Sequence, residues 1–123
     1  MDMSIYKHLY IITFRFATTK QNHNYVARPI YYDFVDFVEN FNDYFEGMGH
    51  CDKTTSTAYI QTNMKIGVLL KKIHQLYKSS ECSIHKNDTM TIIDLENNKL
   101  IAIRRLYQKE WYKLKTKEIL FKS

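Results

Sequence analysis

The sequence predicts a single α+β domain in which helices cover a sheet. Three successive segments carry this prediction. Thr55–Thr62 alternates apolar and polar residues with the period of a strand. Ile66–Tyr77 has apolar residues at helical spacing with lysines between them. Asp88–Leu95 returns to an extended pattern rich in β-branched residues, which completes a strand-helix-strand unit.

The first segments of the chain are predicted to form a strand, a loop and a helix. Leu9–Phe16 is almost continuously apolar, which is typical of a strand in the middle of a sheet. Thr18–Arg28 is polar and is predicted to be a loop. Pro29 suits the first turn of a helix, and apolar residues follow it at helical intervals as far as Phe45.

The segments around this core are defined by turn residues. Gly47 and Gly49 are predicted to end the first helix, and a short strand is predicted within Met48–Lys53. Asn97 and the asparagine after it suit a tight hairpin turn, which leads into a further strand at Leu100–Ile103.

A last helix is predicted after Leu106, because Tyr107, Trp111, Leu114 and Phe121 fit one helical stripe. An extended conformation for the apolar residues 119–121 stays open as an alternative. The basic extension 104–123 belongs to the same single domain, which spans residues 1–123.

The order of the predicted elements is strand, helix, short strand, strand, helix, strand, strand. This order predicts a ferredoxin-like βαββαβ sandwich with an added C-terminal strand and a C-terminal helix. Two helices would cover one face of an antiparallel sheet. We expect the other face to be used by a partner subunit, a nucleic acid or the terminal helix.

Composition and charge indicate a globular protein with a basic end. The chain has 123 residues, of which 45% are hydrophobic and 15% aromatic, and this size can bury a core without metals or disulfides. Its net charge is +5, and the residues from Arg104 onward carry all of it. This distribution indicates an anionic partner for the basic end, although a solubilising helix would look the same.

The remaining composition predicts a cytoplasmic protein without a membrane partner. No segment approaches the roughly 20 apolar residues that span a bilayer. The first residues lack the apolar run of a secretion signal, since Lys7, His8 and Arg15 interrupt it. Cys51 and Cys82 are therefore expected to be reduced thiols.

Several segments carry a resemblance to a known family. They are Ser56–Thr62, Ile66–Tyr77 and Asn87–Leu95, together with Tyr10–Phe14 as the opening strand. These segments resemble the small CRISPR adaptation proteins, and more closely their stand-alone SinR-like and VapD-like relatives. The resemblance covers about Leu9–Ile103 in the order of elements. It implies a ferredoxin-like fold, a homodimer built through the sheets, and nucleic acid as a frequent partner or substrate.

The sequence departs from this family at the end of the first strand. Members described as nucleases carry an aspartate there, and two subunits bring these carboxylates together around a divalent metal. That position falls near Arg15, whose guanidinium offers hydrogen-bond donors and no lone pair for a metal. Paired arginines would attract a phosphate, so a binding role is favoured over catalysis. An ordinary salt bridge of Arg15 is the alternative interpretation.

Other candidate sites are weaker. His50 and Cys51, with Cys82 and His85, have the side chains of a zinc site, but adjacent residues diverge on a strand. We therefore predict no metal and no cofactor. His8, His23 and His74 have no serine, cysteine or acidic neighbour at a diagnostic spacing, so no catalytic residue is predicted. The aspartates at 88 and 94, which flank a strand, are expected in turns.

The best functional patch interleaves basic and aromatic residues after the last strand, where phosphates and unpaired bases could be bound. The predicted nucleic-acid-binding residues are Arg15, Lys20, Arg104, Arg105, Tyr107, Lys109, Trp111 and Lys113. The same patch would also suit a helix that packs on the sheet or on a partner subunit.

The leading interpretation is a homodimeric nucleic-acid-binding protein that is not an enzyme. Two alternatives stay open. One is a protein-interaction module or inhibitor of viral or mobile-element origin, with a protein partner. The other is a metal-dependent ribonuclease of the toxin type, in which a different carboxylate replaces the missing one.

Overall fold

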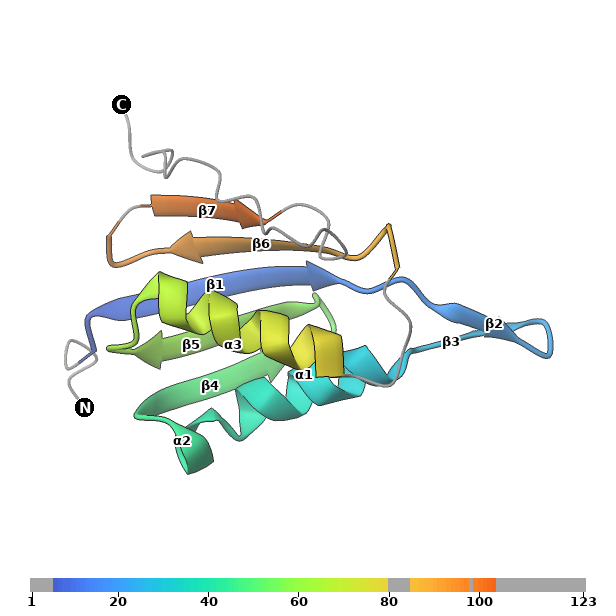
Figure 1. The fold of residues 1–123 in the computed structure, drawn as a ribbon, viewed down its shortest axis with the longest axis horizontal. Coiled ribbons are helices and arrows are strands. Elements are labelled where there is room, and N and C mark those ends of the chain that lie inside the picture. Colours follow the sequence, from blue (N-terminus) through green and yellow to red (C-terminus); the bar gives the residue numbers. More distant parts are fainter. Residues whose placement is uncertain (1–5, 80–84, 98, 104–123) are drawn as a thin grey trace.

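The computed structural model describes residues 6–79, 85–97 and 99–103 (Figure 1). The predicted C-terminal helix lies outside these residues. Within them, the chain folds as an α+β protein with one large antiparallel sheet, in agreement with the predicted fold class. The arrangement is compatible with a ferredoxin-like α+β fold.

The large sheet has five strands in the order β4-β5-β1-β6-β7, and all neighbours are antiparallel. The strands are β1 (His8–Arg15), β4 (Gly47–Asp52), β5 (Thr57–Thr62), β6 (Thr89–Asp94) and β7 (Lys99–Ile103). The apolar β1 lies in the centre, as its composition predicted. Its Ile12 pairs with Ala58 on one side and with Ile92 on the other.

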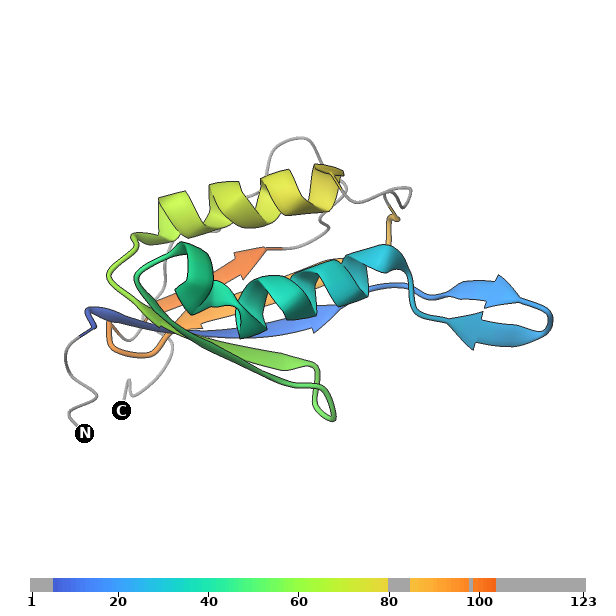
Figure 2. The same cartoon turned by 90° about the horizontal axis from the view of Figure 1, so that it is seen from below.

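The helices lie on one face of the sheet (Figure 2). They are α1 (Pro29–Glu39), the short α2 (Phe41–Tyr44) and α3 (Ile66–Ser79). The prediction of one unbroken helix as far as Phe45 was wrong, because the chain leaves helical geometry at Asn40. This break directs Phe41 into the core, where its side chain is fully buried. No helix in the described ranges is long and apolar enough to cross a bilayer.

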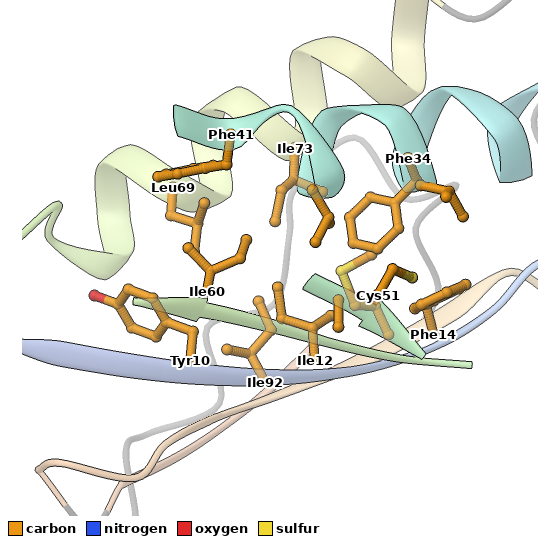
Figure 3. Packing of buried hydrophobic residues seen from close by; sticks show 14 of the residues in the cluster. Tyr10, Ile12, Phe14, Phe34, Phe41, Cys51, Ile60, Leu69, Ile73 and Ile92 are labelled. Atoms are coloured by element: carbon orange, nitrogen blue, oxygen red, sulfur yellow. The ribbon is translucent and has the colours of Figure 1, made fainter. Parts of the chain in front are cut away.

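The core lies between the helices and the inner face of the sheet (Figure 3). Alternate residues of β1, namely Tyr10, Ile12 and Phe14, point into it. The centre of the Phe14 ring lies 4.9 Å from that of Phe34 in α1. Burial of each such side chain stabilises the fold by about 1.5–3 kcal/mol. The intervening residues of β1 lie on the opposite, open face of the sheet.

The prediction that Gly47 and Gly49 end the first helix was wrong. Both glycines lie in β4, beneath that helix. A Cβ on Gly49 would collide with the carbonyl oxygen of Val38, near the end of α1. Gly47 has a φ of +149°, and a Cβ there would lie 2.9 Å from the Phe41 ring. Gly49 is needed because α1 approaches this edge strand closely. Gly47 is needed for its positive φ and because a Cβ there would also collide with the Gln61 carbonyl oxygen of β5.

The prediction of a polar loop at residues 18–28 was also wrong, since most of this segment forms a second, two-stranded sheet. Strands β2 (Thr19–Gln21) and β3 (Asn24–Val26) pair only with each other within the described residues. Asn22 and His23 join them with φ angles of 48° and 69°. Positive φ at both central residues is the geometry of a type I′ turn, which matches the twist of a hairpin.

The close approach of α1 to β4 can be tested with two alanine substitutions. Gly49→Ala is expected to lower the free energy of unfolding by about 1–3 kcal/mol, because the methyl group meets backbone that cannot move easily. Gly67→Ala in α3 is the control, since a Cβ there has open space. It should raise the free energy of unfolding by up to about 1 kcal/mol. Urea unfolding of both variants measures the difference, and equal effects would contradict this packing.

Candidate nucleic-acid interface

Arg15 occupies the end of the central strand and borders three shallow hollows. It is the last residue of β1, its side chain is exposed, and it lies on the open face of the sheet. The hollows have volumes of about 360, 200 and 370 Å³. In the part of the chain that the structure describes, no carboxylate forms a salt bridge with Arg15. The guanidinium is therefore available to an anion.

A group of hydroxyl side chains lies beside Arg15 on the open face. We call it the threonine patch, and it consists of Thr13, Thr55, Ser56, Thr57, Thr89 and Thr91. Register explains it, because Thr13 pairs with Thr57 of β5 and with Thr91 of β6. All of the patch except Thr57 lines the hollow of about 360 Å³. The Thr55 and Thr57 hydroxyls donate hydrogen bonds within the patch. The hydroxyls of Thr13, Ser56, Thr89 and Thr91 can donate to an oxyanion that Arg15 attracts.

The surroundings of Arg15 favour a negative ligand. None of the residues that line the three hollows is acidic, and the sequence has no acidic residue between positions 3 and 32. His85 and Asn87 line the hollow of about 370 Å³, and the exposed Lys86 lies between them in sequence. The edge strand β4 places Asp52 on the open face opposite Thr57 of the threonine patch, where its carboxylate accepts a hydrogen bond from the Thr54 N–H.

A buried ion pair fixes the chain around this end of the sheet. The Arg28 guanidinium donates two hydrogen bonds to the Asp88 carboxylate, with N–O distances of 2.6 and 3.0 Å. Both side chains are buried. The Ala17 N–H and the Tyr77 hydroxyl also donate to Asp88, at 2.8 and 2.6 Å. Arg28 donates a further bond to the Ala17 carbonyl at 3.0 Å, so the ends of the hairpin are joined.

The network determines the charge state of its members. Burial alone would raise the pKa of Asp88, but the hydrogen bonds from Arg28, Tyr77 and Ala17 and the Arg28 charge lower it below its ordinary value. Burial and the hydrogen bond to Asp88 raise the pKa of Tyr77 to about 12. Asp88 is therefore ionised and Tyr77 is neutral at physiological pH, which suits their roles as acceptor and donor.

Sequence reasoning placed Asp88 and Asp94 in turns. Asp88 does end a turn, with its N–H bonded to the His85 carbonyl, whereas Asp94 is the last residue of β6. The burial of both side chains was not predicted. At the end of β1 away from Arg15, Asp94 Oδ2 lies 2.8 Å from His8 Nδ1 and accepts a bond from Asn97. Asp94 Oδ1 has no hydrogen-bond partner among the described residues. The pairing of β1 with β6 brings His8 and Asp94 together, and their sequence spacing could not reveal this.

The zinc ligand set does not assemble on β4. His50 is exposed on the open face, whereas Cys51 is buried in the core, so these neighbours point in opposite directions. Burial raises the pKa of Cys51 to about 11, and the Glu39 carboxylate adds to this shift. Cys82 lies outside the described residues. Within them, no group of three histidine, cysteine or acidic side chains is arranged to hold a metal.

The structure brings two of the predicted binding residues to the same end of the molecule. Arg15 ends β1, and Lys20 follows in the hairpin, where its ammonium lies 6.0 Å from the centre of the Tyr25 ring. The other predicted binding residues lie outside the described residues; they are Arg104, Arg105, Tyr107, Lys109, Trp111 and Lys113.

Comparisons of the chain with family models, with curated proteins and with solved structures find no match. A function is therefore inferred from the geometry and chemistry of this end of the sheet.

The Arg28–Asp88 pair predicts a large and pH-dependent contribution to stability. Asp88→Asn leaves the buried guanidinium without a counter-charge, and the free energy of unfolding is expected to fall by about 3–5 kcal/mol. Because the folded pKa of Asp88 is lowered, its contribution is present above the ordinary pKa of about 3.8 and is lost as the pH falls through the lowered value. Urea unfolding from neutral pH to about pH 2 should show this loss in the wild type only.

A double variant controls for the loss of the charge itself. The double variant Arg28→Met/Asp88→Leu removes both charges. Its loss in the free energy of unfolding should be smaller than the sum of the losses in the single variants Arg28→Met and Asp88→Leu. If Asp88→Asn keeps the stability and acid sensitivity of the wild type, the pair does not hold this region together.

Proposed function

We propose that this chain is a homodimeric nucleic-acid-binding protein with a ferredoxin-like fold. The observation that supports it best is Arg15, which is exposed, borders three hollows and has no acidic neighbour among their linings. The hairpin with Lys20 begins a few residues further on. Positive side chains together with hydroxyl groups are what a phosphate backbone requires.

The strand order favours the ferredoxin-like assignment. In a βαββαβ chain of this type, the first strand lies between the third and the fourth, and the second strand forms an edge. The order β4-β5-β1-β6 has this arrangement, and β7 extends the sheet beyond the last strand. The β2–β3 hairpin is then an insertion between the first strand and the first helix.

The proposed binding is mainly electrostatic and non-catalytic. Arg15 and Lys20 contact phosphates, and the threonine patch donates hydrogen bonds to the same groups. The basic extension 104–123 adds positive charge to the interface. By the resemblance, the position of the metal-binding carboxylate in the nucleases falls near Arg15, so we propose binding without metal-dependent cleavage. Contacts of this kind release counterions and weaken as salt rises.

The proposed homodimer uses the apolar half of the open face. Leu9, Ile11 and Ile93 lie there half-buried, and Tyr59 and Met48 are 39% and 51% exposed. Pairing of Ile11 with Tyr59 and with Ile93 makes these three side chains neighbours, and Leu9 follows on the same face of β1. Gln61 lies between Leu9 and Met48. Such a surface is suited to a second copy of the chain, as in symmetric dimers that bury one shared patch.

Arg15→Ala is expected to weaken nucleic-acid binding about tenfold at low ionic strength, because one charged contact to phosphate is lost. The slope of log K against log salt should fall by about 1 for each Arg15 in contact. Lys71→Ala is the control, since this exposed lysine lies on α3 in the helical layer. Fluorescence anisotropy with a labelled oligonucleotide measures both quantities. Absence of salt-dependent binding by the wild type, or cleavage that requires magnesium, would overturn the proposal.

The dimer can be tested independently of nucleic acid. Tyr59→Glu places two like charges in a symmetric interface and is expected to raise the dimer dissociation constant by at least about tenfold. Tyr44→Glu is the matched control, because Tyr44 is 77% exposed on α2 in the helical layer. Analytical ultracentrifugation compares the two variants. A monomeric wild type, or equal effects of both substitutions, would exclude an interface on the open face.

A second candidate function is a protein-interaction module. Tyr25, Tyr32 and Tyr44 are 75%, 57% and 77% exposed, and exposed tyrosines are enriched in protein interfaces. These rings are spread over the hairpin and the helices and do not surround Arg15. Capture of one stoichiometric protein, in a preparation free of nucleic acid, would favour this function over the first.

A further inference from the structure

The β2–β3 hairpin has one face made of neutral hydrogen-bonding and methyl-bearing side chains. In an antiparallel pair, residues opposite each other lie on the same face of the ribbon. Thr19 lies opposite Val26, and Gln21 lies opposite Asn24. We call these four residues the amide face. The pair Lys20 and Tyr25 lies on the other face.

The hairpin projects away from the body of the protein (Figures 1 and 2). Every residue from Thr18 to Val26 is exposed, so the hairpin contributes nothing to the core. An isolated two-stranded hairpin is at best marginally stable in water. Its type I′ turn and the hydrogen bond from Arg28 to the Ala17 carbonyl nevertheless fix the hairpin where it leaves the body of the protein. This arrangement suits an arm that contacts a partner.

We propose that this hairpin is a β-ribbon whose amide face enters the major groove of B-form DNA. This inference rests on the nucleic-acid binding proposed above. The major groove is about 12 Å wide and admits a two-stranded ribbon. The Gln21 and Asn24 amides can each bond N6 and N7 of adenine, and the methyl groups of Thr19 and Val26 can contact the thymine methyl. The ligand class is therefore duplex DNA with A·T pairs at the contacted positions.

The charge around the hairpin supports this choice of partner. No acidic residue occurs between positions 3 and 32, so the arm itself carries no carboxylate. The ionised Asp88, which contacts the root of the arm at Ala17, is paired with the Arg28 guanidinium. Lys20 on the other face can reach a groove wall. The major groove of duplex RNA is too deep and narrow for side chains to read. A protein partner that adds a strand to the hairpin edge is the competing occupant, and the experiment below distinguishes it.

The test compares amides of the arm with matched amides elsewhere. The double variant Gln21→Ala/Asn24→Ala alters the hairpin, and Asn42→Ala/Gln75→Ala alters exposed amides of α2 and α3. Both variants are expected to fold, since all four side chains are exposed. Circular dichroism and thermal unfolding check this. Anisotropy at one low salt concentration is measured with an A·T-containing DNA duplex, with duplex RNA of the same sequence, and with DNA carrying 7-deazaadenine or uracil.

The wild type is expected to bind the DNA duplex more tightly than the RNA duplex. The hairpin variant should lose at least about fivefold in affinity for DNA, and the control variant should lose none. Replacement of adenine by 7-deazaadenine, which lacks N7, should weaken the wild type by a similar factor and leave the hairpin variant unaffected. Uracil in place of thymine should also weaken the wild type, because the methyl contact is lost.

The outcomes separate this inference from the function on which it rests. If the wild type binds no nucleic acid, the proposed function fails. If it binds DNA but the hairpin variant and the modified bases change nothing, the ribbon is not in the major groove, while the proposed function stands. If the hairpin variant alters only the sedimentation of the protein, the arm contacts a protein chain and the inference is overturned.

Discussion

The buried pair of Arg28 and Asp88 is the constraint on which the rest of this structure depends. It joins segments that are distant in sequence: the exit of β1 at Ala17, the start of α1, the end of α3 at Tyr77, and the entry to β6. Two charges are costly to remove from water, and this cost is offset only when nearly all their hydrogen-bonding groups are satisfied. The bidentate geometry and the bonds from Ala17 and Tyr77 meet that condition. The pair therefore fixes where β1 ends, and with it the positions of Arg15 and the hairpin root.

Strand β1 serves the core and the proposed interface at once. Its inward residues fill the core beneath the helices, and its outward residues change in character along the strand: Leu9 and Ile11 are apolar, whereas Thr13 and Arg15 are polar. Neighbouring strands follow the same change through register, since Ile11 pairs with Tyr59 and Ile93, and Thr13 pairs with threonines. Along β1 the open face thus changes from mainly apolar to mainly hydroxyl side chains, with Gln61 and His50 as polar residues in the apolar half.

The sequence predicted the elements that bury a periodic stripe and missed those that do not. The strands at Thr57–Thr62 and Thr89–Asp94 and the helix α3 were predicted because their apolar residues recur at a fixed spacing. The hairpin has no buried residue and hence no period, and its turn is Asn22-His23 in place of the more recognisable Asn-Gly. The turn at Asp88 was predicted, but its burial and ion pair were not, because its partner Arg28 is 60 residues away and only the folded chain reveals that pairing. For Arg15, the sequence identified the residue but not the hollows around it.

The division of the open face makes the two parts of the proposed function compatible. A second copy that packs on the apolar half would cover Leu9, Ile11 and Tyr59. Removal of these side chains from water lowers the free energy of the dimer. The threonine patch and Arg15 would remain accessible. Against an apolar surface, hydroxyl and guanidinium groups would lose their hydrogen bonds to water and form no new ones. Each subunit would then present one hairpin and one Arg15, and two-fold symmetry would repeat this basic surface. Duplex DNA has an approximate two-fold symmetry of its own in its backbone, so a symmetric dimer could contact both strands with equivalent residues.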